Sequence, residues 1–316
     1  MLFESARSFI YKNARPLDLA RWRYLFEGGG REDVLTALAA YQNGDGGFGH
    51  ALEPDCWNPE SSPIQTWAAT EILGEIGLTD GEHPIIRGIL AYLASGKDFD
   101  GHVWANAVPS NNLHPHAGWW EYSPGQPPSY NPTAALIGFI LRFAPADGGL
   151  YAMARRLAEE AWAAFRRDFP TDSMHTAACF VELYEVQKAR PDGPAEELED
   201  LGRLLREQIR HVITYDTSVW GTDYVCRPSL FIRSRSSEFY AGNEEICRYE
   251  CDFIADSQNP DGAWDLTWAW EGYPEQWHIS KNWWKSDWII KNLRFLRAMG
   301  ADAPAETPGT GIRKEV

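Results

Sequence analysis

Two carboxylates lie two residues apart in a segment whose glycines disfavour regular structure. Glu53 and Asp55 fall within residues 46–55, which contain three glycines and a proline. Neighbouring carboxyl groups can share a proton, which raises the pKa of one of them into the range of a general acid. We therefore predict catalytic roles for both, with His50 and Trp57 beside them contacting substrate. The alternative is that both carboxylates cap helix termini or bind loop amides.

A second loop, residues 111–121, also concentrates reactive side chains. His114 and His116, with Glu121 nearby, could bind a divalent metal. They could equally make polar contacts at the rim of an aromatic pocket, or pack within the loop. We predict that these three residues act in catalysis and that no cofactor is needed. The side chains of this loop predicted to contact substrate are Trp119 and Trp120.

The third segment, residues 264–284, is dominated by aromatic rings. Their π faces can stabilise cations, and their flat apolar area can stack on sugar rings. The alternative is that each ring closes one end of the fold, with its indole N–H bound to a carbonyl. His175 begins a predicted helix and either packs in the core or faces the same cavity. The residues predicted to contact substrate are His175, Trp268, Trp270, Trp277, His278, Trp283 and Trp284.

Apolar residues recur at helical spacing along most of the chain. Strand signals are weak, so the fold class is all-α. The three reactive segments fall in long connections between helices, which are usually functional when they occur in compact domains. The predicted helices are residues 2–13, 17–26, 32–41, 63–76, 84–94, 132–143, 150–168, 174–188, 194–215, 241–257 and 285–299.

One phrase occurs twice in the chain. Gln42–Phe48 and Gln258–Trp264 each read Gln, Asn, one residue, Asp-Gly, one residue and an aromatic. Asp-Gly favours a tight turn, because Gly tolerates positive φ and Asp can bind its own backbone. We expect the Gln to bind backbone at the end of its helix and the aromatic ring to pack over the turn. Weaker copies occur at 97–104 and 216–221.

The spacing of these turns predicts the architecture. Neighbouring turns are separated by roughly 40 to 60 residues, which leaves room for one pair of helices per turn. About six such pairs, arranged in a ring, would use the whole chain. We therefore predict a single domain over residues 1–300, followed by a flexible tail over 301–316.

Both copies of the phrase resemble a known motif. Gln258–Trp264 resembles the QW repeat of squalene–hopene and oxidosqualene cyclases, and Gln42–Phe48 resembles its Phe variant in protein prenyltransferase β subunits. The resemblance implies an (α/α)6 barrel with a cavity at one mouth. The chain lacks the DxDD acid motif of the cyclases; Asp98–Gly101 is the nearest match. It also lacks the Asp-x-Cys zinc ligands of the prenyltransferases.

Composition excludes several classes of partner. The net charge of -16 disfavours nucleic acid and anionic membrane surfaces. No run of 18 apolar residues is present, so we expect no membrane span, and the N-terminus lacks the features of a signal peptide. The five cysteines include no Cys-x-x-Cys, which favours a reduced, cytoplasmic protein.

Three functions remain open from the sequence. The first is a terpenoid cyclase- or prenyltransferase-like enzyme, with an isoprenoid or other apolar substrate in an aromatic-lined cavity. The second is a carbohydrate-active hydrolase, lyase or epimerase that uses paired carboxylates. The third is a non-catalytic barrel that binds a ligand or partner. All three predict a small-molecule or partner site, and the sequence leaves the oligomeric state open.

Overall fold

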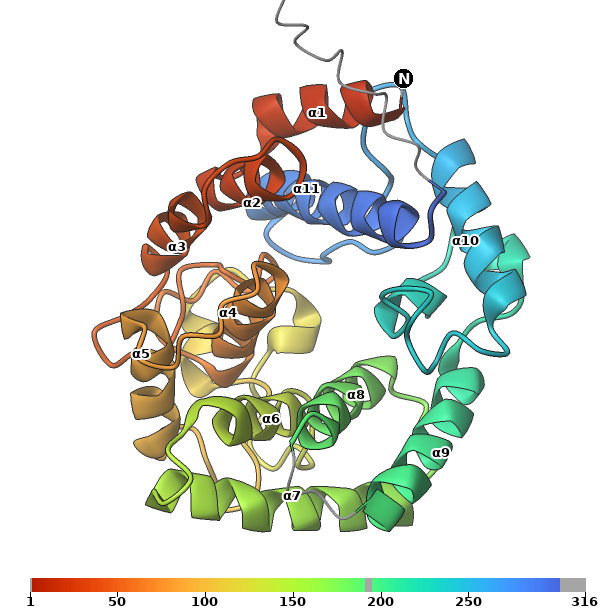
Figure 1. Cartoon of the computed structure of the whole chain (residues 1–316). Helices are drawn as coiled ribbons and strands as arrows, with labels where there is room; N and C mark the ends of the chain where they lie inside the picture. The colour runs from red at the N-terminus through yellow and green to blue at the C-terminus, as the bar shows by residue number, and fades with distance from the viewer. Residues whose placement is uncertain (1, 191–194, 302–316) are drawn as a thin grey trace, which may run out of the picture.

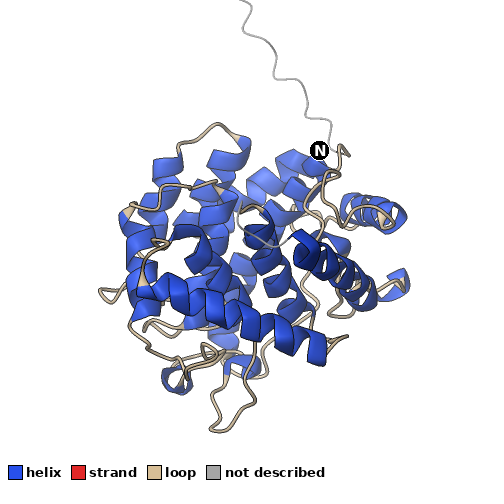
Figure 2. Ribbon diagram, turned by 60° about the horizontal axis from the view of Figure 1, so that its bottom comes forward, coloured by secondary structure: helices blue, strands red, loops and turns tan. Residues whose placement is uncertain are grey.

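The protein is built almost entirely from helices. The computed structural model describes residues 2–190 and 195–301, so the tail predicted at 301–316 lies, apart from its first residue, outside the described residues. Within the described ranges there are eleven α-helices, four short 3-10 helices and isolated β-bridges, but no strand (Figure 2). The all-α prediction is therefore confirmed.

Most helices begin and end within three residues of the predicted positions. The last helix is the exception, because it begins at Pro274 rather than at Lys285. Its first turns are rich in Trp and His and lack an amphipathic apolar pattern, so they were predicted as loop. The α-helices are α1 (Leu2–Asn13), α2 (Pro16–Phe26), α3 (Arg31–Ala39), α4 (Pro63–Glu75), α5 (Pro84–Ala94), α6 (Thr133–Phe143), α7 (Gly149–Arg167), α8 (Met174–Lys188), α9 (Ala195–Val212), α10 (Glu244–Asp256) and α11 (Pro274–Ala298).

The helices form a ring in which outer and inner elements alternate along the chain. Figure 1 shows α1, α3, α5, α7, α9 and α10 on the outside and α2, α4, α6, α8 and α11 nearer the centre. Between α9 and α10 the chain instead forms two short 3-10 helices, η3 (Thr217–Val219) and η4 (Pro228–Leu230), and this segment reaches inward. The predicted barrel of six helical pairs stays a prediction.

The first copy of the repeated phrase forms a tight turn that joins two helices. The Gln42 side-chain amide donates to the carbonyl oxygens of Gly46, at 2.9 Å, and of Ile85 in the first turn of α5, at 3.1 Å. Asp45 accepts a hydrogen bond from the backbone two residues later, and Phe48 is fully buried. The expected Asp-Gly turn is confirmed.

The second copy repeats this geometry at the other end of the chain. The Gln258 amide donates to the carbonyl oxygens of Gly262 and of Leu2 in the first turn of α1, both at 2.9 Å. Asp261 accepts from the backbone two residues later, and the Trp264 indole is buried. Because α1 begins the chain, this turn connects its last quarter to its first helix.

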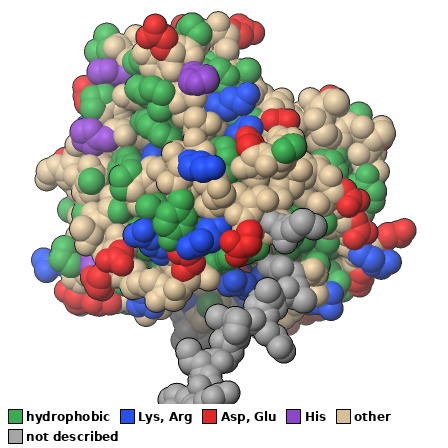
Figure 3. All heavy atoms as spheres, turned by 90° about the horizontal axis from the view of Figure 1, so that it is seen from above, with side chains coloured by type: hydrophobic (Ala, Val, Ile, Leu, Met, Phe, Trp, Pro, Cys, Tyr) green, Lys and Arg blue, Asp and Glu red, His purple; other side chains and the backbone are tan. Residues whose placement is uncertain are grey.

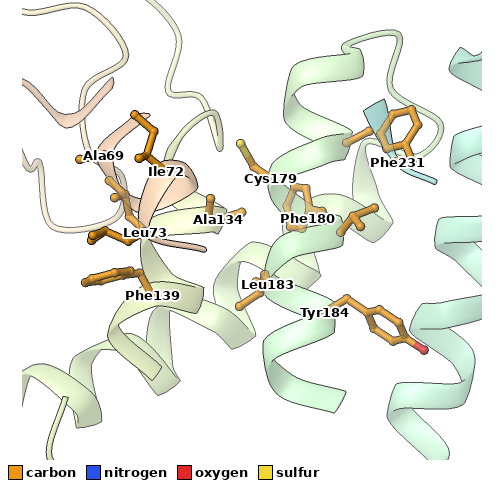
Figure 4. Packing of buried hydrophobic residues seen from close by; sticks show 14 of the residues in the cluster. Ala69, Ile72, Leu73, Ala134, Phe139, Cys179, Phe180, Leu183, Tyr184 and Phe231 are labelled. Atoms are coloured by element: carbon orange, nitrogen blue, oxygen red, sulfur yellow. The ribbon is translucent and has the colours of Figure 1, made fainter. Parts of the chain in front are cut away.

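The core lies between the outer and inner helices. Figure 4 shows Ala69, Ile72 and Leu73 of α4 near Phe139 of α6. Phe180 of α8 packs against Tyr130, Trp162 and Phe165 in the same cluster. One side of each inner helix is thus committed to packing, which leaves its other side free to face the centre.

The outer surface carries mixed charge. Figure 3 shows acidic and basic side chains interspersed on one face. All five cysteines are free and buried. Among the described residues no helix is both long and apolar enough to span a bilayer. The cytoplasmic location stays a prediction.

Candidate functional site

The loop that carries Glu53 and Asp55 is held rigidly against two helices. Gln65 of α4 accepts a hydrogen bond from the backbone N–H of Leu52 at 3.0 Å and donates to the carbonyl of Asn58 at 2.9 Å. Arg15, just before α2, donates to the carbonyl of Ala51 at 2.8 Å. The backbone of Ala51 has a φ of 59°, the left-handed region that costs energy for residues other than glycine. The loop therefore maintains a strained path next to the carboxylates.

Glu53 and Asp55 both lie buried in this loop, and Glu53 accepts a loop-amide hydrogen bond of the kind that the alternative expects. The Asp55 backbone N–H donates to Glu53 Oε2 at 2.9 Å. Glu53 is 8% exposed and Asp55 is 2% exposed. Burial and the neighbouring Asp55 charge raise the pKa of Glu53 well above its usual value. The surroundings of Glu53 therefore favour its protonated form.

Indole N–H groups stabilise the ionised form of Asp55. Trp270 and Trp284 each donate to Asp55 Oδ1 at 2.7 Å. Burial raises the pKa of Asp55, whereas these hydrogen bonds lower it, and the balance is a pKa of about 6. Burial thus favours the protonated form of Glu53, whereas the indole donors favour the ionised form of Asp55.

Two further indoles face the same carboxyl groups. Trp120 helps to lower the pKa of Glu53 and Trp268 that of Asp55, each partly offsetting the effect of burial. Both indole N–H groups are buried and lack a hydrogen-bond partner among the described residues. Both N–H groups are nevertheless directed at these carboxyl groups and act on their pKa values without meeting hydrogen-bond geometry.

The predicted aromatic segment and the first loop meet at a second point. Trp57 stacks on Trp283 with ring centroids 5.4 Å apart and donates to Ser280 Oγ at 2.8 Å. Ser280 in turn donates to the Pro54 carbonyl at 2.7 Å. The early start of α11 makes this contact possible, because it places Ser280 and Trp283 on a helix.

The predicted histidine loop packs beside the carboxylate loop. The backbone N–H of Ala117 donates to the Asp55 carbonyl at 2.9 Å, and the His116 ring lies 5.9 Å from Tyr273. His116 Nδ1 binds the His114 carbonyl at 2.6 Å, so this ring is engaged within its own loop. Among the described residues no three His, Cys, Asp or Glu side chains converge as metal ligands. The metal alternative gains no support from this geometry.

His175 belongs to the site through a residue that sequence reasoning missed. Tyr224 makes a 3.0 Å hydrogen bond with His175 Nε2 and contacts Trp268, with ring centroids 5.4 Å apart. Desolvation by the neighbouring side chains raises the pKa of Tyr224 to about 12 although 51% of this residue is exposed, and the Asp55 and Glu53 charges contribute. No sequence pattern distinguishes Tyr224 from its neighbours in the segment before η4.

Several predicted residues lie away from the paired carboxylates. His50 binds Asn43 at 2.9 Å, which ties it to the turn at 42–48, and its contact with substrate stays a prediction. Glu121, Trp119 and His278 are exposed, and no contact joins them to the carboxyl groups. Trp277 packs on Trp270 with ring centroids 5.7 Å apart.

A surface hollow of ≈ 580 Å³ lies elsewhere, between α1 and the turn at 258–264. Its lining includes Lys12, Asp261 and Asn282 but none of the residues around Glu53 and Asp55. We therefore place the candidate site at the paired carboxylates, where polar groups converge and pKa values are shifted.

Replacing Lys291 by methionine is expected to raise the pKa of His175. Burial lowers the pKa of this imidazole, and the positive charge of Lys291 lowers it further. Removing that charge favours the imidazolium. Titration of the histidine ring protons by NMR measures the change, with Lys281→Met on the same helix as the control. An identical His175 titration in all three proteins would contradict the placement of Lys291 near this ring.

Comparison of this chain with protein-family models, curated proteins and solved structures finds no match in any of the three. The resemblance to QW-repeat proteins accordingly stays a prediction, and the functional argument depends on the geometry of the site.

Proposed function

We propose that this protein is a carbohydrate-active enzyme that uses Glu53 and Asp55 in acid–base catalysis. The main support for the proposal is that the surroundings of the two buried carboxyl groups favour the protonated form of one and the ionised form of the other. Burial and the charge of Asp55 favour the protonated form of Glu53, while indole N–H groups favour the ionised form of Asp55. Environments that push two neighbouring pKa values apart are typical of an acid and a base acting on one substrate.

The proton transfers are balanced between the two groups. Glu53 donates its proton to a substrate oxygen, and Asp55 accepts a proton from water or from a substrate hydroxyl. Exchange with solvent then removes the proton from Asp55 and returns one to Glu53.

The orientation of the aromatic rings favours a polar substrate over an isoprenoid. Trp270 and Trp284 present their polar N–H edges to Asp55. The guanidinium of Arg15 lies 5.3 Å from the centroid of the Trp283 ring, and that of Arg227 lies 4.3 Å from the centroid of Trp288. These rings already have cations of the protein beside them. A site that stabilises carbocations would need π faces that are open to the substrate. The isoprenoid hypothesis is therefore the less favoured of the two.

The fold that we propose for this site is a closed (α/α)6 barrel in which the segment 217–240 replaces one inner helix. The alternation of outer and inner helices supports it, as does the turn that links Gln258 to Leu2. Closure would place the loops that carry Glu53, His116 and Trp268 around one mouth. The third alternative, a non-catalytic barrel, gives no reason for a strained loop beside a buried carboxyl group whose pKa is raised.

A ligand screen tests the proposed function. Thermal-shift measurements would compare maltose, cellobiose, xylobiose and chitobiose with farnesyl diphosphate and squalene. We expect at least one sugar to raise the melting temperature and to be turned over, with no shift from the two isoprenoids. Stabilisation by an isoprenoid alone would overturn the proposal in favour of the cyclase-like hypothesis. Binding of a sugar without turnover would favour the non-catalytic one.

A further inference from the structure

Charged side chains from four separate elements gather around the centre of the ring. Arg233 Nη2, in the segment after η4, lies 3.8 Å from Glu182 Oε1 on α8 and 4.0 Å from Glu71 Oε1 on α4. The Trp67 indole N–H donates to Glu182 Oε2 at 3.4 Å. Lys291 of α11 pairs with Asp287 and contributes its charge to the same region. We name the central charged cluster as Trp67, Glu71, Glu182, Arg233 and Lys291.

Water reaches this cluster although its residues lie on inner elements. The side chain of Arg233 is 59% exposed and that of Lys291 is 54% exposed. On the same helices the core-facing residues Leu73, Leu183 and Leu293 are almost fully buried. The cluster therefore lies on the side of these helices that is turned away from their core-facing residues.

Helical spacing connects this cluster to the paired carboxylates. On α8, His175 and Glu182 are seven residues apart, so both lie on one face, roughly 10 Å from each other. On α11, Trp284 binds Asp55, and Lys291 follows two turns later on the same side. A ligand that reached from Glu53 and Asp55 to the cluster would thus be longer than one sugar ring.

The chemistry of the cluster fits a neutral ligand rich in hydroxyl groups. The contacts of Arg233 with both carboxyl groups are longer than hydrogen bonds, so guanidinium donors and carboxyl acceptors lie side by side. A hydroxyl can both donate and accept, and so can satisfy both kinds of group. An anionic ligand would be repelled by Glu71 and Glu182, and a cationic ligand would be repelled by Arg233 and Lys291.

We propose that the central charged cluster is a second binding subsite, which takes a further sugar ring of the substrate that meets Glu53 and Asp55. The substrate class is accordingly an oligosaccharide or an extended glycoside. This inference rests on the proposed function. Burial and the nearby Glu71 raise the pKa of Glu182 to about 8, so Glu182 can also donate a hydrogen bond to a ligand at neutral pH.

Calorimetry with sugars of two lengths tests the subsite. Glucose, xylose and N-acetylglucosamine would be compared with maltose, cellobiose, xylobiose and chitobiose. We expect a disaccharide to bind at least about 10-fold tighter than its monosaccharide, since the second ring adds one or two hydrogen bonds to charged groups. Arg233→Met is expected to remove most of this difference while monosaccharide binding stays unchanged. Arg235→Met, an exposed arginine of the same segment, is the matched control.

The outcomes separate this inference from the proposed function. Equal binding of mono- and disaccharides, or equal effects of Arg233→Met and Arg235→Met, would overturn the subsite and leave the acid–base site intact. Absence of any sugar binding would overturn both. The melting temperature of each variant would be measured first. If Arg233→Met alone fails to fold, Glu182→Ala provides the same comparison, with Glu197→Ala as its control.

Discussion

Replacing Gly262 by alanine is expected to lower the free energy of unfolding by about 3 to 5 kcal/mol. Gly262 has a φ of +94°, and a Cβ there would lie 2.0 Å from the carbonyl oxygen of Ser5 in α1. The variant therefore combines backbone strain with a clash against backbone that cannot rotate away. Relief would require the turn to move off α1, which would break the contact that connects the two ends of the chain. Urea denaturation followed by circular dichroism measures the loss.

The other copy of the turn supplies a replicate, and its neighbour supplies a control. A Cβ at Gly46 would lie 2.1 Å from the carbonyl oxygen of Gly88 in α5, so Gly46→Ala is expected to be similarly destabilising. Gly44 lies in the same turn, but a Cβ there would have nothing within 4 Å. Gly44→Ala should change stability by less than about 1 kcal/mol. If all three variants were equally stable, the close approach of turn and helix would be wrong.

The turns were predictable from sequence because their geometry is local. Asp45 and Gly46 specify the turn through their own backbone preferences, and Asp261 and Gly262 do the same. The hydrogen bond of each glutamine to a carbonyl of a distant helix was not predictable. Gln258 binds Leu2 across nearly the whole chain, and no property of either residue indicates the other. Sequence therefore predicts the turn but not the helix to which it binds.

The candidate site was only partly predictable for the same reason. Glu53 and Asp55 could be found because both carboxylates occur in one short segment. The Trp284 indole donates to Asp55, which lies 229 positions earlier in the sequence. The sequence therefore identified the aromatic residues as a group but could not show which of them binds which carboxyl group. Tyr224 and Arg15 carry no local pattern at all. Their contribution depends on tertiary contacts alone.

The central charged cluster was missed because helix periodicity cannot distinguish two kinds of polar environment. Glu71 and Glu182 lie at helix positions that a sequence pattern assigns to solvent. In a ring of helices, solvent lies both outside the ring and at its centre. The polar side of an inner helix faces the solvent at the centre. The two environments differ in dielectric and in neighbouring charge, and this difference raises the pKa of Glu182 to about 8.

Asp55→Asn and Glu53→Gln are each expected to lower kcat/KM by about 10²- to 10⁴-fold on a sugar identified in the ligand screen. Each variant keeps the shape of its side chain but cannot exchange the proton that the proposed reaction requires. In the parent protein, activity should fall as the pH drops through about 6, because Asp55 becomes protonated. It should also fall at the higher pH at which Glu53 loses its proton, since the pKa of Glu53 is raised. Glu60→Gln, an exposed glutamate of the same loop, should leave the profile unchanged.

Stability separates a catalytic role of Glu53 from a structural one. Its folded-state pKa is raised, so the folded protein holds this proton more tightly than the unfolded chain does. The contribution of Glu53 to stability is therefore greatest below the unfolded pKa and declines as the pH rises toward the folded value. Glutamine cannot ionise, so Glu53→Gln should be at least as stable as the parent at pH 7 while losing activity. A large loss of stability at pH 7 with retained activity would instead make Glu53 a structural residue of its loop.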